Sequence, residues 1–283
     1  MRIQTKMAAK RSLNTTLSQA IIHSKPGTLM KLRYAMIWVY GLAGLVLFGC
    51  AAKEKPVTPE DYMRLGEQQS AEKQQQHARE TYQDLLEKFP ESEYRAQAQF
   101  NIADSLYQEK NYLEARFEYQ KFLELHPAHP LASRAQYQIA MCSLQQVQHH
   151  DRDQRHTQDA LRAFRQLRRT YPQDELIPQA EVHIRDLRQR LADHELAVAR
   201  FYYRKGAYHA AIGRLLNLIQ VYPTSPDLDA ALYILAKSYY AEENFAKAQR
   251  VFRTLVDRFP ASSYVSRSRA QLRQLPVTGI TLQ

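Results

Sequence analysis

The stretch AIGRLLNLIQVYP, residues 211–223, decides the fold because its spacing occurs five times along the chain. Each copy begins with an alanine, followed by an aromatic or aliphatic residue after four positions, another after seven and a proline after twelve. The alanines are Ala78, Ala115, Ala160, Ala211 and Ala248; the next residues are Tyr82, Tyr119, Phe164, Leu215 and Phe252, then Leu85, Phe122, Leu167, Leu218 and Leu255, and the prolines are Pro90, Pro127, Pro172, Pro223 and Pro260. Offsets of four and seven place these side chains on one stripe of a helix. Because proline disfavours the helical conformation in the residue before it, each helix is predicted to end just ahead of its proline.

A second, preceding helix is indicated in every copy by a small residue upstream of the alanine. These small residues are Gly66, Ala103, Ala140, Ala199 and Ala236. Helix pairs of this kind are typical of the tetratricopeptide repeat, whose period is about 34 residues. The prolines here are 37, 45, 51 and 37 residues apart, so the repeats are irregular. The sequence therefore predicts an all-α fold, an α-solenoid of five irregular tetratricopeptide repeats, with a C-terminal capping helix at residues 263–275.

The segments around the repeats divide the chain. Repeats 1–3 are assigned to residues 59–172, and residues 173–275 hold one long helix at 178–205, repeats 4 and 5 and the capping helix. In the third repeat, residues 147–158 are expected to form a loop inserted between the two helices. Residues 276–283 are expected to form a flexible tail.

Two helix starts are indicated by a capping residue that is followed by proline. These are Thr58 before Pro59 and Ser225 before Pro226. In both cases we expect the hydroxyl residue to cap the helix and the proline to occupy its first turn.

The N-terminal residues have the form of a secretory signal peptide, predicted over residues 1–49 with Met30 as the true start. Its apolar run ends at Cys50 and is shorter than the roughly twenty residues that span a bilayer. The sequence LFGC resembles a bacterial lipobox, so Cys50 is predicted to be lipidated, with residues 50–58 as a linker. Ala51 and Ala52 follow the cysteine, at a place where an aspartate is associated with retention of bacterial lipoproteins in the inner membrane. The resemblance to a lipobox therefore implies anchoring at the cell outer membrane, on the periplasmic face. An uncleaved signal anchor is the alternative, and Cys142 has no expected disulfide partner.

The net charge of +10 comes mostly from the leader, because the first 33 residues contain seven Lys or Arg and no acid. Without those seven charges the chain is near +3, which is poor evidence for nucleic-acid binding. A basic stretch does occur later in the chain, and it comprises Arg162, Arg165, Arg169, Arg185, Arg188 and Arg190. We expect these arginines to meet solvent or the carboxylates of a protein partner, and nucleic acid is the alternative.

No nucleotide-binding loop, CxxC pair or hydrolase motif occurs, and eight glycines argue against glycine-rich phosphate loops. The chain is therefore expected not to be an enzyme and to need no cofactor beyond the covalent lipid on Cys50. The most enzyme-like cluster stands in the inserted loop and comprises His149, His150, Asp151, Asp153 and His156. Such side chains could hold zinc or nickel if the loop folded around the ion. We expect a solvated loop and no metal site, because nothing fixes these groups on one face of a rigid element.

The first helices of stacked pairs line a concave groove in a solenoid of this type. The repeat register places seven residues of the N-terminal half toward it, namely Met63, Glu67, Phe100, Asp104, Tyr107, Tyr137 and Met141. Aromatic side chains beside acids suit an extended peptide that contains aromatic residues. For Phe100 and Tyr137, burial in the core is the alternative.

The lipobox, the linker and the five irregular repeats together resemble the BamD family of outer-membrane β-barrel assembly lipoproteins, also called ComL competence lipoproteins. The likeness covers residues 47 to about 275. It is closest in the third and fourth repeats, where the inserted loop, the long helix and the RKGAY turn at 204–208 fall as in the family.

The resemblance implies a lipid-anchored scaffold of the β-barrel assembly machinery. Its N-terminal repeats would bind unfolded outer-membrane protein segments, and its C-terminal repeats would bind the periplasmic domain of the barrel-forming, BamA-like insertase. Accessory lipoproteins are further implied partners, and no nucleic acid is expected.

Two arginines are assigned to the expected insertase contact. Arg214 matches the family's arginine near that contact, and Arg204 lies in the RKGAY turn. A guanidinium fork pairs with a carboxylate in a geometry that lysine does not offer. The alternative for Arg214 is a plain surface arginine. Two other functions remain open: a periplasmic repeat protein that coordinates envelope constriction or peptidoglycan work with Tol–Pal proteins, and a DNA-uptake lipoprotein.

Overall fold

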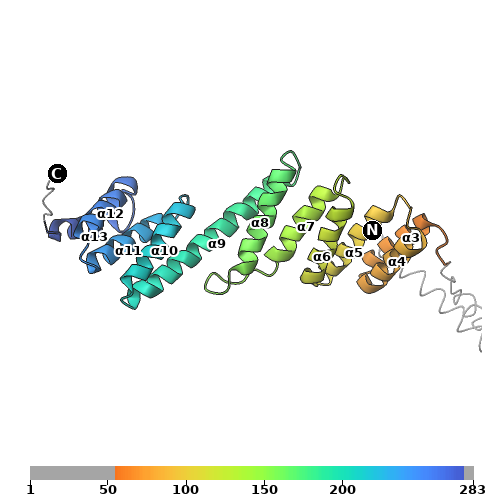
Figure 1. Cartoon of the computed structure of the whole chain (residues 1–283), viewed down its shortest axis with the longest axis horizontal. Helices are drawn as coiled ribbons and strands as arrows, with labels where there is room; N and C mark the ends of the chain where they lie inside the picture. Colours follow the sequence, from red (N-terminus) through yellow and green to blue (C-terminus); the bar gives the residue numbers. More distant parts are fainter. Residues whose placement is uncertain (1–54, 277–283) are drawn as a thin grey trace, which may run out of the picture. The chain divides into compact units, whose positions relative to one another are not determined.

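The computed structural model describes residues 55–276 (Figure 1). The predicted signal peptide, the lipidation at Cys50, most of the linker and nearly all of the predicted tail lie outside the described residues. Within this range no strand occurs, and the helices are α3 (Pro59–Ala71), α4 (Gln75–Lys88), α5 (Arg95–Gln108), α6 (Tyr112–Leu125), α7 (Ala132–Leu144), α8 (Arg155–Thr170), α9 (Ile177–Arg204), α10 (Tyr208–Val221), α11 (Leu228–Ala241), α12 (Phe245–Arg258) and α13 (Val265–Gln274).

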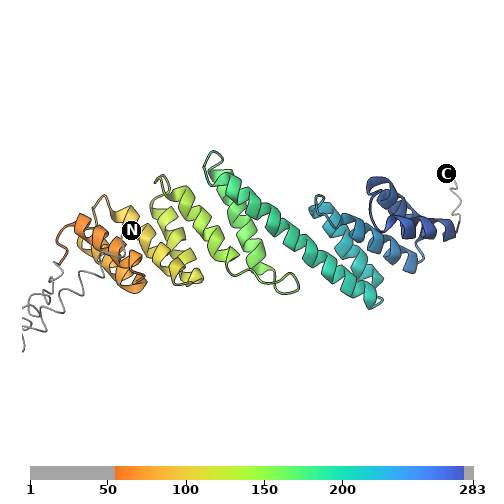
Figure 2. The same cartoon turned by 180° about the vertical axis from the view of Figure 1, so that it is seen from behind.

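These helices form five successive pairs, α3–α4 to α11–α12, followed by the single helix α13. Each helix packs on the one before it and the one after it (Figure 2). The segments 59–172 and 173–275 meet through α8 and α9, so the described helices belong to one continuous unit that begins at Pro56. The predicted α-solenoid of five tetratricopeptide repeats with a capping helix is confirmed.

The repeated alanines lie where the paired helices cross. All five are completely buried, as are the residues that follow them by seven positions. The small residues of the preceding helices are buried as well. Each of the five second helices ends before its proline, and the intervening residue has φ between −123° and −133°, as the proline requires.

One of the two predicted helix starts is confirmed. Thr58 caps α3: its hydroxyl accepts from the Asp61 amide, while the Asp61 carboxylate accepts from the Thr58 amide. The prediction at Ser225 is wrong, because α11 begins at Leu228. Ser225 instead accepts a hydrogen bond from the Asp227 amide within a turn, and Pro226 lies in that turn.

The two predicted irregularities of the third and fourth repeats are present. The long helix is α9, Ile177–Arg204, with 28 residues. The inserted loop is shorter than predicted, because α8 already begins at Arg155. Asp153 accepts from the Arg155 amide at 2.9 Å, and Thr157 donates to Gln154 at 2.9 Å, so the polar residues of this segment start the helix early.

The turns inside four of the repeats share a left-handed residue. Lys73, Lys110, Gly206 and Glu243 have φ of 62°, 65°, 76° and 59°, and each precedes the buried alanine by five positions. The turn lets the next amide reach back into the first helix, as Asn111 does to the Leu106 carbonyl at 2.9 Å. Only one repeat places glycine at this position.

Cys142 lies completely buried in the core between α5, α6 and α7. It is a free cysteine, and burial raises the pKa of its thiol to about 12. None of the described helices is both long and apolar enough to cross a bilayer.

The crossing at Gly66 supplies a test of the packing. A Cβ at this position would lie 2.4 Å from Cε1 of Tyr82, whose ring is buried. We expect Gly66→Ala to destabilise the protein by roughly 1–3 kcal/mol through overpacking, despite the better helix propensity of alanine. The measurement is urea unfolding followed by circular dichroism.

The matched control is the double variant Gly66→Ala/Tyr82→Leu, which copies the combination Ala199 and Leu215 of the fourth repeat. It should recover part of the lost stability. A single variant as stable as the parent would show that this crossing is not tightly packed.

The left-handed turns supply a second test. Lys110→Gly should stabilise the protein by about 1 kcal/mol, since a side chain at positive φ is strained. Gly206→Ala should destabilise it by a similar amount. Thermal unfolding of both variants checks this, and two shifts of the same sign would contradict the assignment of strain.

Candidate functional site

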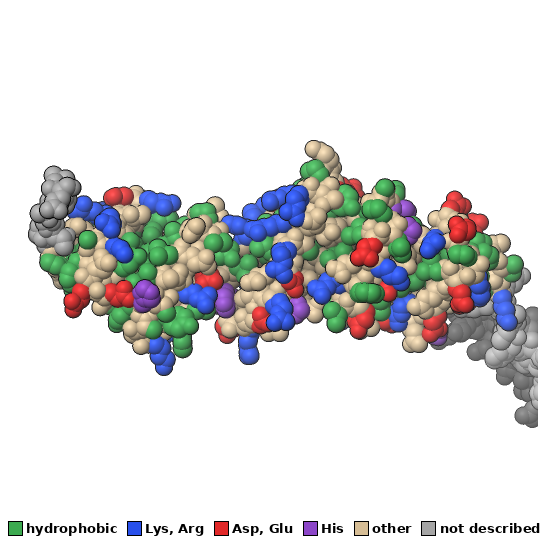
Figure 3. Space-filling view, in the orientation of Figure 1, with side chains coloured by type: hydrophobic (Ala, Val, Ile, Leu, Met, Phe, Trp, Pro, Cys, Tyr) green, Lys and Arg blue, Asp and Glu red, His purple; other side chains and the backbone are tan. Residues whose placement is uncertain are grey.

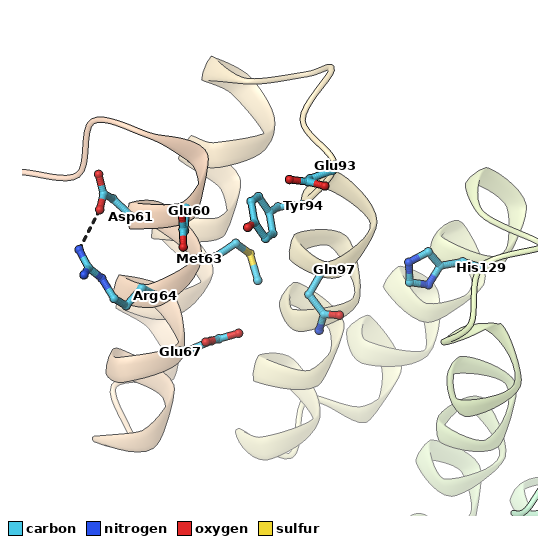
Figure 4. Close-up of a pocket in the computed structure, with 9 residues that line it drawn as sticks. All are labelled: Glu60, Asp61, Met63, Arg64, Glu67, Glu93, Tyr94, Gln97 and His129. Atoms are coloured by element: carbon cyan, nitrogen blue, oxygen red, sulfur yellow. Dashed lines mark hydrogen bonds and ion pairs between the residues drawn. The ribbon is translucent and has the colours of Figure 1, made fainter.

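A hollow of about 900 Å³ lies between α3 and the start of α5, in the first two repeats (Figure 4). Its lining consists of Glu60, Asp61, Met63, Arg64, Glu67, Glu93, Tyr94, Gln97 and His129. The picture shows Met63 pointing from α3 toward Tyr94 and Gln97, with His129 on the far side of α5. The hollow therefore combines an apolar floor with a rim of carboxylates.

The cap of α3 fixes two of the charged groups. Asp61 accepts from the Thr58 hydroxyl at 2.9 Å and from the Arg64 guanidinium at 2.8 Å. The hydrogen bonds from Thr58 hold the pKa of the Asp61 carboxyl below its usual range. Asp61 and Arg64 thus neutralise each other at the mouth of the hollow.

Three carboxylates remain without an ion pair in the described part of the chain: Glu60, Glu67 and Glu93. All three are exposed. The charge of Glu60 is the main cause that raises the pKa of the Tyr94 phenol, followed by burial. A hollow with uncompensated negative charge around Met63 and an aromatic ring suits a segment that carries a cationic side chain next to an apolar one.

Two of the seven residues predicted for the groove line this hollow, Met63 and Glu67. Phe100 does not face a groove, because it is 4% exposed and packs edge-on against Tyr119 and Phe122. Tyr137 is 8% exposed and packs on Phe164. For both aromatic residues the structure corrects the groove assignment in favour of the core.

The other three predicted groove residues are partly buried away from the hollow. Asp104 accepts from the Tyr119 hydroxyl at 3.0 Å, so its carboxylate serves the packing of α5 on α6. The Tyr107 hydroxyl accepts from Gln145 at 3.3 Å. Met141 packs against the core of the third repeat.

The prediction missed the contribution of the turns. Glu93 and Tyr94 precede α5, and His129 precedes α7. A signal for Tyr94 was present, because it follows Pro90 by four positions as Tyr264 follows Pro260. The repeat register therefore extends past the proline into the start of the next helix.

The two arginines assigned to partner binding are exposed. Arg214 lies on α10, is 46% exposed and forms an ion pair with Glu195 of α9 at 3.4 Å. Arg204 is the last residue of α9. Their role toward a partner stays a prediction.

The polar loop before α8 is held by hydrogen bonds within the loop and to side chains of α9. His149 Nδ1 lies 2.8 Å from an oxygen of Asp151, and His194 Nδ1 lies 2.5 Å from the His150 carbonyl oxygen. Across the described residues, no three His, Cys, Asp or Glu side chains come together as metal ligands would.

The stacked pairs and their packing define a tetratricopeptide-repeat protein, and that repeat family matches residues 233–274. The YfiO family, described as outer membrane lipoprotein, matches residues 56–250. Because this match covers more than half of the sequence, the chain belongs to the YfiO family of outer membrane lipoproteins.

Curated relatives carry the name "Outer membrane protein assembly factor BamD", which confirms the resemblance drawn from the sequence. That of Caulobacter vibrioides is 31% identical over 124 residues, 44% of this chain and 41% of the relative. That of Neisseria gonorrhoeae is 29% identical over 116 residues, 41% and 43% of the two chains. That of Vibrio cholerae is 32% identical over 99 residues, 35% and 41%. The chain thus spans about two fifths of the length of the curated relatives it matches.

Among solved structures, the chain is similar to the TPR2AB-domain:pHSP90 complex of yeast Sti1. The two are 12% identical with a TM-score of 0.44, over 76% of this chain and 83% of the other.

The hollow supplies a test that needs no partner protein. A labelled extended peptide in which lysine alternates with aromatic residues should bind the folded chain. Glu67→Lys/Glu93→Lys should weaken this binding about tenfold by replacing attraction with repulsion. Fluorescence anisotropy provides the measurement.

The control is Glu80→Lys/Glu87→Lys, which makes the same charge change on exposed positions of α4 that do not line the hollow. This control should change the affinity for the peptide less than about twofold, because salt screens the interaction between the peptide and exposed charges outside the hollow. Equal losses in both variants would mean that only net charge matters.

Proposed function

We propose that this protein is a lipid-anchored, non-enzymatic scaffold of the outer-membrane β-barrel assembly machinery. The observation that carries this proposal is the match of residues 56–250 to the outer membrane lipoprotein family, with BamD assembly factors as relatives. In this role the protein binds unfolded outer-membrane protein segments with its N-terminal repeats and the barrel insertase with its C-terminal repeats.

The anchor is the acylated Cys50, which holds the repeats at the periplasmic face of the outer membrane. Two or more acyl chains on this one residue are enough for stable attachment, whereas a single chain binds a membrane only marginally. Accessory lipoproteins then bind in the same assembly machinery, and the protein contacts the outer-membrane lipid through its anchor.

The hollow between α3 and α5 receives the unfolded segment. An unfolded barrel strand alternates apolar and polar side chains. The partly exposed ring of Tyr94 contacts an apolar side chain, while Glu67 and Glu93 attract a basic one. Met63 is 5% exposed and supports this ring from the core. Because the acids around the hollow are exposed to solvent, the hollow suits weak binding of many different segments.

The insertase docks around Arg214. This arginine already pairs with a carboxylate of its own chain, Glu195, which is 15% exposed. The guanidinium is nearly half exposed and has free N–H donors, so it can donate to a second carboxylate from a partner without losing Glu195.

The proposal is tested by co-purification from detergent-solubilised outer membranes. A tagged full-length chain should bring down the barrel insertase, and Arg214→Glu should lower the recovered insertase at least fivefold, because like charges would then face each other. Quantitative mass spectrometry of the eluate is the measurement.

Lys121→Glu is the matched control. Lys121 lies on α6, is 47% exposed and pairs with Glu118, so its environment resembles that of Arg214 in a different repeat. Recovery of Tol–Pal or cell-wall proteins in place of the insertase would overturn the assembly role.

A further inference from the structure

The outward face of the second helices is not constrained by packing, so its residues differ between the repeats. Positions two, five and nine after the buried alanine lie on this face. On α8 they are Arg162, Arg165 and Arg169. The corresponding residues are Glu80, Gln83 and Glu87 on α4, Phe117, Gln120 and Glu124 on α6, Gly213, Leu216 and Gln220 on α10, and Arg250, Arg253 and Asp257 on α12. Among the described second helices, only α8 carries arginine at all three positions.

These arginines border a groove of about 1050 Å³ between α6 and α8, with α7 as its floor. Arg116 of α6 faces them from the opposite wall, and Ile139 of α7 contributes to the apolar floor. Figure 3 shows Lys and Arg side chains gathered over α8 and the first half of α9.

The groove contains more positive than negative charge. Asp159 pairs with Arg162 and lies 3.9 Å from Arg116, so one carboxylate serves two guanidinium groups. Arg165 and Arg169 have no carboxylate partner among the described residues, and Arg169 donates to the Gln166 amide oxygen.

Arg165 is the most crowded of these cations. It is half-buried, and burial together with the charges of Arg188 and Arg168 lowers the pKa of its guanidinium. Arg168 is compensated by Glu181, and Arg188 lies over the Tyr222 ring and donates to the Val221 carbonyl. Arg165 has no carboxylate partner among the described residues, so the attraction of an anion at this point would offset the repulsion from Arg188 and Arg168 and part of the desolvation cost.

The groove continues into a hollow of about 520 Å³ between α4, α5 and α6, where the apolar residues Ile102, Leu106, Leu113 and Phe117 lie beside the polar and charged residues Arg79, Gln83, Glu114, Arg116, Glu118 and Gln120. Arg116 and Gln120 line both spaces. The hollow is bordered by Leu113 and Phe117, which are 62% and 63% exposed. Large apolar side chains this exposed, near Arg165 and Arg169 that lack a carboxylate partner among the described residues, mark a docking surface of mixed character.

We propose that the outer face of α6 and α8 docks an acidic, amphipathic segment of a partner protein, with its apolar side chains on Phe117 and Leu113 and its carboxylates on Arg165 and Arg169. Successive arginines of α8 lie about 4.5 and 6 Å apart along the axis, which matches acids spaced three and four residues apart on a helix. A recessed groove with an apolar extension fits such a segment better than it fits a flat membrane surface. This surface is separate from the acidic hollow between α3 and α5 and takes a ligand of opposite charge.

The experiment measures binding of a labelled helix-forming peptide with glutamates at i, i+3 and i+7 and leucines on the neighbouring stripe. The peptide should bind the full chain at low salt and lose affinity as salt rises. Arg165→Glu/Arg169→Glu should weaken binding about tenfold. Phe117→Ser should weaken it severalfold without changing its salt dependence.

The matched control is Arg250→Glu/Arg253→Glu, which makes the same change at two of the equivalent positions of α12. It should change the affinity less than about twofold. Parallel arms use a peptide with glutamine in place of glutamate, phosphatidylglycerol vesicles and duplex DNA.

Three results would overturn the proposal. They are no binding of the acidic peptide at about 50 mM salt, equal loss in the α8 and α12 variants, and arginine-dependent binding of vesicles or DNA with none of the peptide. None of these depends on whether the insertase co-purifies.

Discussion

The structure depends on the close crossing of two helices at an alanine and a small residue. Ala115 and Ala103, for example, are both completely buried where α6 meets α5. Small side chains bring the helix axes near each other, and the aromatic or leucine residues one and two turns further fill the remaining space. Each helix pair buries its apolar faces only when the next pair packs on it. The helix crossings within and between the repeats are therefore continuous along the solenoid.

This packing uses one stripe of each second helix and leaves the outward stripe free. The outward positions carry different side chains in different repeats, with glutamates on α4 and arginines on α8. The first helices and their turns leave a different surface, where Glu60, Glu67 and Glu93 have no ion pair among the described residues. One scaffold thus presents an acidic hollow and a basic groove that cannot compete for the same ligand.

The structural features that follow directly from the spacing of the repeats could be predicted from the sequence. The buried alanines, the helix ends before the prolines and the length of α9 were all accessible, because each follows from local sterics. Phe100 and Tyr137 were misassigned to the groove, because periodicity gives the face of a helix but not which neighbour covers that face. The start of α11 was misplaced because Ser225 and Pro226 are equally suited to a turn and to a cap. Tyr94 was missed although its spacing from Pro90 was a signal, and Glu93 and His129 were missed because a hollow built from turns needs the relative placement of neighbouring repeats, which no local pattern encodes.

The length of α9 has a consequence for how this chain can vary. Its first half packs on α8 and its second half on α10, so the two ends must present their apolar faces in a fixed angular relation. Inserting or deleting one residue in the middle would turn the following half by about 100° and expose its face. Natural length changes in this helix should therefore occur in steps of about seven or eleven residues, which restore the angular phase.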